Sequence, residues 1–255
     1  MFNFGLFEDT IGYSVAVLTP LYKRKPEHSK NIEIGYVHDL RGFFPRLRRA
    51  DIRLNWYKNT TKNIFDRDAN YEMRQFEKRI LEGLELQGRY DQGNFFADLG
   101  ISYNIRNKFC DKESAIINND FSIRGNSIHP VCVNGGNANG YLKNTILPKY
   151  SITSNLGMRL LDEKLELGTR LVYHTNVKDT RNKSLFEAGF SGYSNVPRWT
   201  PVFLVDAYIN YQVNEHLLLT LSGTNLTDRY YLDPMTRSSM PAPGRTVKFG
   251  LTARF

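Results

Sequence analysis

Histidine and cysteine are the side chains of this sequence best suited to ligand chemistry, and the chain holds five of the first and two of the second. Imidazole binds metal ions and the iron of haem. His28, His129 and His174 fall in segments that could carry such a site, although a solvated imidazole is the simpler interpretation of each. His38 and His216 lie beside short connections and are poorer candidates.

Cys110 and Cys132 are the two thiols. The sequence has no Cys-x-x-Cys pair, and the only histidine near a cysteine is His129, three positions before Cys132. A structural zinc site draws its four ligands from closely spaced thiols and imidazoles. We therefore predict no metal site, and what the thiols do depends on where the fold places them.

Charge and composition narrow the class of protein. Lys and Arg number 34 against 26 Asp and Glu, so the formal net charge is +8. Basic residues are scattered among acidic ones, and we interpret the one dense group, Arg46, Arg48 and Arg49, as a solvated turn, so no nucleic-acid partner is expected. The 41% of hydrophobic residues exclude a disordered chain, and no apolar run approaches the length of a membrane helix.

The C-terminal ten residues show the pattern that dominates the chain. Apolar side chains occupy alternate positions, namely Val247, Phe249, Leu251, Ala253 and Phe255. Successive side chains of a β-strand point to opposite faces, so this segment has one apolar and one polar face. With 13% aromatic residues and 19 glycines, the chain is predicted to be all-β.

The same alternation recurs in eight further segments. They are residues 31–39, 50–59, 80–90, 94–105, 150–160, 164–176, 201–213 and 216–225. Their length is roughly that of a tilted strand that crosses a membrane. Residues 11–18 are a weaker tenth candidate.

The connections between these segments alternate between long and short. The long ones are residues 60–71, 107–148, 178–199 and 226–244, and residues 40–49 are intermediate. Transmembrane β-barrels have short periplasmic turns and long outer loops. We therefore predict part of an antiparallel transmembrane β-barrel of about 9–10 strands. A soluble β-sandwich, whose strands also alternate, is the structural alternative.

This topology places both cysteines in the longest outer connection. The cell exterior is oxidising, so a Cys110–Cys132 disulfide is predicted. Closing a loop of about 20 residues contributes roughly 3 kcal/mol. The same topology puts His129 in that connection, His28 at the outer rim, and His174 on the polar face near the outer end of its strand.

Three motifs follow one another in a recognisable order. Residues 25–36 read KPEHSKNIEIGY, and residues 82–86 read EGLEL. The third motif comprises Asn225, Leu226, Thr227, Asp228, Arg229, Tyr230 and Tyr231, then Pro243, Gly244 and Arg245, then a strand that ends in Phe255. Together the motifs resemble those of TonB-dependent outer-membrane receptors, with the 241–245 variant closer to the haem and haemophore branch.

The resemblance implies a receptor in the outer membrane of a Gram-negative cell, and not an enzyme. Its cargo would be haem or another iron chelate, or haem delivered by a carrier protein, and haem would not be a resident cofactor. His174, His129 and His28 are then candidate haem ligands. Asn225 and Asp228 would hydrogen-bond the turning backbone. Tyr230 and Tyr231 would join the aromatic belt.

The family also has a plug domain, a TonB-contacting box and a signal peptide. Glu8 and Asp9 stand where a signal peptide would carry positive charge, so none is predicted, and no plug is recognisable. Residues 25–255 are expected to be the C-terminal part of a receptor barrel and residues 1–24 an irregular segment or partial strand. TonB would be reached only through a plug, and this chain alone would not transport.

Two functional alternatives remain open. The cargo could be a siderophore in place of haem. The chain could also be a complete ten-stranded outer-membrane barrel with enzymatic activity, which would need acids and histidine gathered at the outer rim. Activity assays on the folded protein distinguish this enzyme from a receptor.

Overall fold

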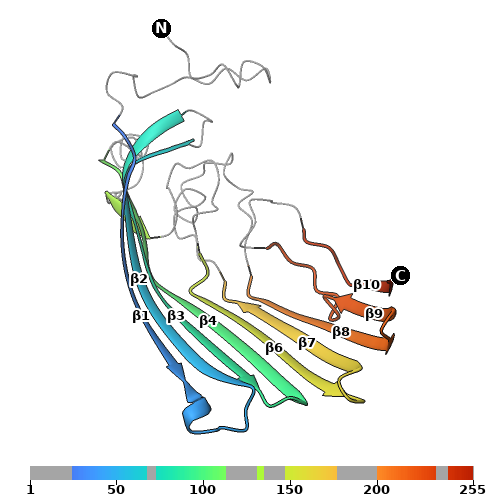
Figure 1. The fold of residues 1–255 in the computed structure, drawn as a ribbon. Coiled ribbons are helices and arrows are strands. Elements are labelled where there is room, and N and C mark those ends of the chain that lie inside the picture. Colours follow the sequence, from blue (N-terminus) through green and yellow to red (C-terminus); the bar gives the residue numbers. More distant parts are fainter. Residues whose placement is uncertain are drawn as a thin grey trace.

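The computed structural model describes residues 25–67, 73–112, 131–134, 147–176, 200–233 and 241–254. These residues form one antiparallel sheet, in the order β1-β2-β3-β4-β6-β7-β8-β9-β10, with the short β5 paired to β4 (Figure 1). The elements are β1 (His28–Asp39), η2 (Leu40–Gly42), β2 (Arg49–Arg67), β3 (Met73–Asp91), β4 (Phe95–Cys110), β5 (Cys132–Asn134), β6 (Tyr150–Leu160), β7 (Leu165–His174), β8 (Val202–Asn214), β9 (Leu217–Thr224) and β10 (Thr246–Ala253). The predicted all-β antiparallel architecture is confirmed.

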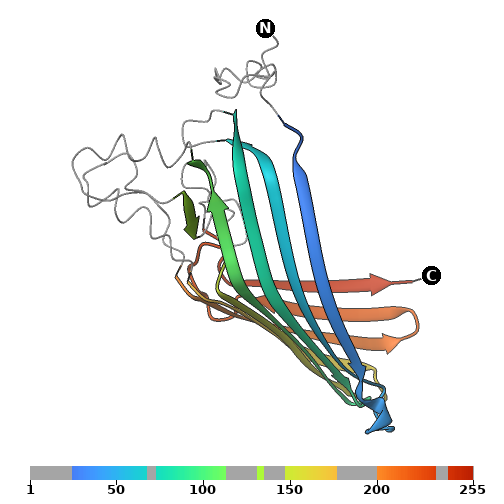
Figure 2. The same ribbon diagram turned by 90° about the vertical axis from the view of Figure 1, so that its left-hand side faces the viewer.

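Strand order follows chain order, so the sheet is a meander that bends into a curved wall (Figures 1 and 2). The short connections, residues 40–48, 92–94, 161–164 and 215–216, all lie at one end of the strands. The longer connections lie at the other end, as the spacing of the strands predicts. No helix within the described parts of the chain is long and apolar enough to cross a membrane.

The two longest strands correct one prediction. Residues 60–71 are expected to be a connection, but β2 continues to Arg67 and β3 begins at Met73. Beyond Trp56 the same side of β2 carries Lys58, Thr60 and Lys62, while the pairing with β3 continues. Backbone hydrogen bonds need no apolar face, so a strand that rises clear of the lipid loses its alternation and remains a strand.

The connection predicted over residues 107–148 needs a smaller correction of the same kind. β4 extends to Cys110, and β5 forms a three-residue strand within the stretch. The predictions for residues 1–24, for the candidate strand 11–18, for His129 and for Phe255 concern residues outside those that the structure describes.

One face of the sheet is apolar across all nine long strands. The pairing aligns Ile34 with Trp56, Trp56 with Leu84, and Leu84 with Tyr103. Large side chains on this face stay uncovered, with Phe249 71% exposed and Ile34 65% exposed. A sandwich would bury these residues between two layers, whereas the described residues form a single layer. The apolar face is therefore built to meet lipid.

The edges of the sheet are β1 and β10. In the described part of the chain β1 pairs only with β2, and β10 only with β9, so the sheet is open. Backbone groups at membrane depth need hydrogen-bond partners, which requires further strands at both edges.

Candidate functional site

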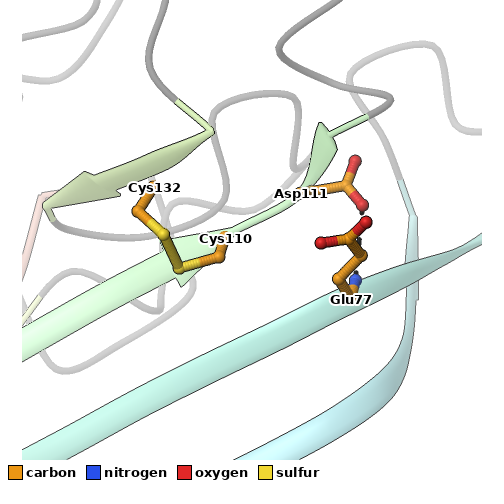
Figure 3. The surroundings of a disulfide bond; sticks show 4 residues. All are labelled: Glu77, Cys110, Asp111 and Cys132. Atoms are coloured by element: carbon orange, nitrogen blue, oxygen red, sulfur yellow. Dashed lines mark hydrogen bonds between the residues drawn. A yellow bond between two sulfur atoms is a disulfide. The ribbon is translucent and has the colours of Figure 1, made fainter.

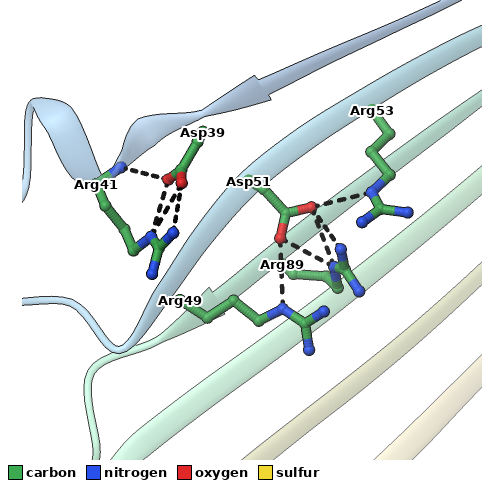
Figure 4. A network of polar contacts seen from close by, with 6 residues as sticks. All are labelled: Asp39, Arg41, Arg49, Asp51, Arg53 and Arg89. Carbon is green, nitrogen blue, oxygen red and sulfur yellow. Dashed lines mark hydrogen bonds and ion pairs between the residues drawn. The ribbon is translucent and has the colours of Figure 1, made fainter.

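The opposite face of the sheet is polar, and several of its charged side chains form ion pairs. Near the short-connection end, Asp51 of β2 accepts two parallel hydrogen bonds from Arg89 of β3, with N···O distances of 2.9–3.0 Å (Figure 4). Arg53 and Arg49 also approach this carboxylate, at 3.3 and 3.4 Å. The Asp51 side chain is 14% exposed, so three cations compensate one largely buried anion.

A second cluster surrounds Arg159 of β6. Its guanidinium lies 3.0 Å from the Asp91 carboxylate and 3.4 Å from that of Glu166, and it stacks 4.5 Å from the ring centre of Phe96. The Tyr208 hydroxyl donates to Glu166 at 3.0 Å. These contacts run from β3 to β8 across the polar face, and they compensate the charges within this cluster.

Aromatic rings on this face cover glycines on the neighbouring strand. Phe96 lies opposite Gly157, and Tyr208 lies opposite Gly168. A Cβ atom on Gly157 would come within 2.1 Å of the Phe96 ring, and one on Gly168 within 2.3 Å of Tyr208. Glycine is required at these positions because the ring occupies the space of the missing side chain.

The turns at this end carry an ion pair outside the strands. Arg48, after η2, pairs with Glu163 in the β6–β7 turn, and Arg41 pairs with Asp39 (Figure 4 shows the second pair). The hydrogen bond from Arg48 lowers the pKa of the Glu163 carboxyl below its usual range. The first pair ties the β1–β2 turn to the β6–β7 turn, across the β3–β4 turn that lies between them in the sheet.

His174 is the histidine that the structure places best for a ligand. It lies at the outer end of β7 on the polar face and is half-buried, and its Nδ1 is 2.9 Å from the Ser151 hydroxyl. The Asp233 carboxylate, in the connection after β9, is close enough to act on this ring electrostatically. The Nε2 atom forms no hydrogen bond with the residues that the structure describes.

The other candidate histidines do not join His174. His28 is exposed at the outer end of β1, and four strands separate β1 from β7 in the sheet. His129 lies outside the described residues. Within those residues, no three His, Cys, Asp or Glu side chains gather closely enough to hold a metal ion.

The motif after β9 holds the outer end of three strands together. The Asn225 side chain donates to the carbonyls of Arg229 and Pro243, and accepts from the Arg229 amide at 2.9 Å. Its own amide donates to Asp206 of β8. Asn225 is 4% exposed and has φ of 50°, a left-handed conformation that asparagine adopts more readily than most residues.

Asp228 fixes the start of β10 to the same connection. Its carboxylate accepts from the Arg245 amide at 2.9 Å, directly before β10. Tyr230 is 77% exposed, and Tyr231 is half-buried. On the residues described, the motif therefore organises the connection, and its exposed side chains are Thr227, Asp228, Arg229 and Tyr230.

Cys110 and Cys132 form a disulfide that joins β4 to β5 (Figure 3). The next residue, Asp111, is 5% exposed, and sequence reasoning did not single it out. Its amide donates to Val131 and its carboxylate accepts from the Glu77 amide at 3.3 Å. The available signal was an acid directly after a cysteine of the predicted disulfide. The pairs of Asp51 and Arg159 were missed because they depend on strand register.

The chain is similar in sequence to known outer-membrane receptors. Residues 5–226 match the family model described as TonB dependent receptor-like, beta-barrel. The chain is 40% identical over 261 residues to the hemophilin receptor of Acinetobacter baumannii, an alignment that covers 98% of this chain and 24% of that protein. It is 25% identical to a probable TonB-dependent receptor of Haemophilus influenzae, over 87% of this chain and 27% of that protein.

Solved structures share the fold at low identity. The FrpB iron transporter of Neisseria meningitidis superposes with a TM-score of 0.62 at 18% identity, over 95% of this chain and 33% of that one. The siderophore receptor PirA of Acinetobacter baumannii gives 0.57 at 16% identity, over 91% and 32%. The chain thus spans about a quarter to a third of the length of these proteins.

Proposed function

The chain belongs to the family of TonB-dependent receptor β-barrels, and from that premise we propose that it forms part of an outer-membrane receptor for haem, delivered by a haem-carrying protein. The observation that carries the proposal is the 40% identity to a hemophilin receptor across 98% of this chain, which includes the long outer connections. Those connections are where a receptor meets its partner, so likeness there bears on the ligand more than likeness of strands does.

The two faces of the sheet support a role in the barrel wall. The apolar face suits lipid, and the polar face suits a lumen through which a charged ligand passes. Because Asp51, Arg89, Arg159 and Glu166 are paired on the wall, these side chains offer no free charge that would trap an anionic chelate at this level. Binding is then assigned to the outer end, and His174 is the candidate axial ligand there.

We propose that TonB acts on the complete receptor only through its plug domain, which opens the barrel when TonB supplies energy. The chain spans about a quarter of the hemophilin receptor, so transport is a property that we assign to the whole receptor and not to this stretch alone.

A siderophore is the second cargo considered. The structural neighbours include a siderophore receptor and an iron transporter. Because their sequence identity is only 16–18%, they support a shared fold and not a shared cargo. The reported relatives are named as receptors and a transporter, and none of them as an enzyme. Haem is therefore the cargo that we propose.

Growth tests the proposal. A strain that lacks its own haem receptor receives the complete receptor that contains this chain, and haem on its carrier protein is the only iron source. We expect growth with the receptor and none with this chain alone. Growth on a ferric siderophore but not on haem would contradict the haem assignment.

His174 can be tested in the same strain. We expect His174→Ala to slow growth on haem severalfold at equal receptor abundance, with Ser151→Ala as the control that removes its hydrogen-bond partner and keeps the imidazole. Unchanged growth of His174→Ala would remove this histidine from the binding site without affecting the family assignment.

A further inference from the structure

The connection from β1 to β2 folds over the apolar face of the sheet, at the end where the connections are short. Its residues form a compact turn, in which the amides of Phe43 and Phe44 donate to the Leu40 carbonyl and that of Leu47 donates to Phe44. The Arg48 amide donates to the Asp91 carbonyl of β3 at 2.8 Å. The turn is therefore fixed to the sheet and does not hang free from it.

A cavity of about 790 Å³ lies between this turn and the strands. Phe43, Phe44 and Leu47 line it from the turn, and Ile52, Leu99 and Leu156 are among the residues that line it from β2, β4 and β6. The strand side chains belong to the apolar face, as their cross-strand pairing shows. The volume lies within the range of roughly 300–1,000 Å³ that is usual for small-molecule sites.

The position of the cavity points to a lipid. In barrels of this kind the short connections are periplasmic, so the cavity lies where the apolar band ends on the periplasmic side. Phe43 is 73% exposed and Phe44 58% exposed, as is common for aromatic residues at a membrane–water boundary. An acyl chain that enters here leaves bulk lipid and stays within an apolar surface.

One cation at the cavity lacks a counter-ion. Arg41, Arg48 and Arg49 pair with Asp39, Glu163 and Asp51. Arg46 lines the cavity, and among the described residues its side chain has neither an ion pair nor a hydrogen bond. A guanidinium can bind the two oxygens of a phosphodiester together. Arg46 thus supplies the group that a phospholipid headgroup needs beside a site for its acyl chain.

We propose that this cavity binds one phospholipid of the periplasmic leaflet, with an acyl chain between the turn and the apolar face and the phosphodiester on Arg46. The binding involves no covalent step. The site depends on the chain lying in a membrane and is independent of the cargo, so it stands whether the receptor takes up haem or a siderophore.

Gly88 of β3 offers a clean way to close the cavity. It lines the cavity, and a Cβ atom built on it meets nothing within 4 Å. Gly88→Leu therefore fills the space without pressing on the backbone. Gly250→Leu on β10 is a control for the added side chain on the polar face, because its Cβ meets only ordinary contacts at 3.7 Å and lies far from the turn. Arg254→Gln is the control for Arg46→Gln, since it removes a charge at the same end of the sheet.

The experiment uses the complete receptor purified from outer membranes in a mild detergent, with dioleoyl-phosphatidylglycerol added and bound lipid counted by native mass spectrometry. We expect one tightly held lipid on the unmodified receptor and on both controls. Arg46→Gln should weaken its retention about fivefold, the factor that one basic residue provides near anionic lipid. Gly88→Leu should abolish it, and heat-modifiable gel migration verifies that each variant is folded.

Three results would overturn the proposal. Equal retention by the unmodified receptor and Arg46→Gln would remove the headgroup contact, and that variant remains informative if Gly88→Leu does not fold. Retention of dioleoylglycerol as tight as that of the phospholipid would show that no phosphate is bound. A preference for lipopolysaccharide over phosphatidylglycerol would assign the cavity to a different lipid. None of these results bears on the haem assignment.

Discussion

The two faces of this sheet are stabilised in different ways. On the apolar face, Phe249 is 71% exposed, and Leu86 lies between the apolar side chains of Leu54 and Ile101. On the polar face, Asp51 and Arg159 each contact two or more partners, and rings cover glycines. A position on the apolar face therefore accepts any apolar side chain of suitable size. A position on the polar face instead requires the particular residue that fits its contact partner. Substitutions on the two faces should differ accordingly.

The largest contrast is expected from adding one charge to each face in the middle of β3. Leu86→Arg puts a cation into lipid and should lower the free energy of unfolding by about 2–4 kcal/mol. Gln87→Arg adds the same charge on the polar face and should cost less than about 1 kcal/mol. Urea titrations of the receptor folded into vesicles measure both. Equal losses would show that the apolar face does not meet lipid.

A second contrast compares glycines on opposite faces. Gly157→Leu forces the new side chain into the Phe96 ring, and such overpacking typically costs about 1–3 kcal/mol. Gly88→Leu enters open space and should leave stability nearly unchanged. The temperature at which heat-modifiable migration is lost reports both. Gly157→Leu combined with Phe96→Ala should recover part of the loss, and failure to recover would argue against the ring-over-glycine contact.

The smallest effect is expected in the exposed turns. The hydrogen bond from Arg48 lowers the pKa of Glu163 from its ordinary value of 4.5. A pKa that is lower in the folded state stabilises the protein at pH values above 4.5. This stabilisation disappears as the pH falls through the pKa of the folded state. Glu163→Gln should thus be slightly less stable than the unmodified receptor at pH 7, and the difference should be smaller at pH 3. Unfolding curves at the two pH values check this, and a constant difference would contradict it.

The strands could be predicted because lipid on one side and water on the other impose alternation with a period of two. The prediction failed at residues 60–71, where both faces of β2 and β3 meet water and the alternation vanishes. The third motif could be recognised in sequence, yet the contacts of Asn225 with Arg229 and Pro243 depend on a backbone path that spacing does not define.

The candidate site was predictable only in part. The position of His174 on the polar face follows from counting along β7, and the cysteine pair follows from its shared connection. The pairing of Asp51 with Arg89 requires the register between β2 and β3, which a single sequence leaves free. The cavity under Phe43 and Phe44 depends on how a turn folds back, and no periodicity encodes that.

The length of the β2–β3 hairpin has a mechanical consequence. Each strand has 19 residues, and a tilted membrane strand uses about 9–11, so roughly 30 Å of paired strand projects beyond the bilayer at about 3.4 Å per residue. Phe76 and Phe109 pack edge to face at 5.2 Å within this projection, close to the disulfide that joins β4 to β5. The ring contact and the disulfide therefore brace a hairpin that rises well clear of the bilayer surface.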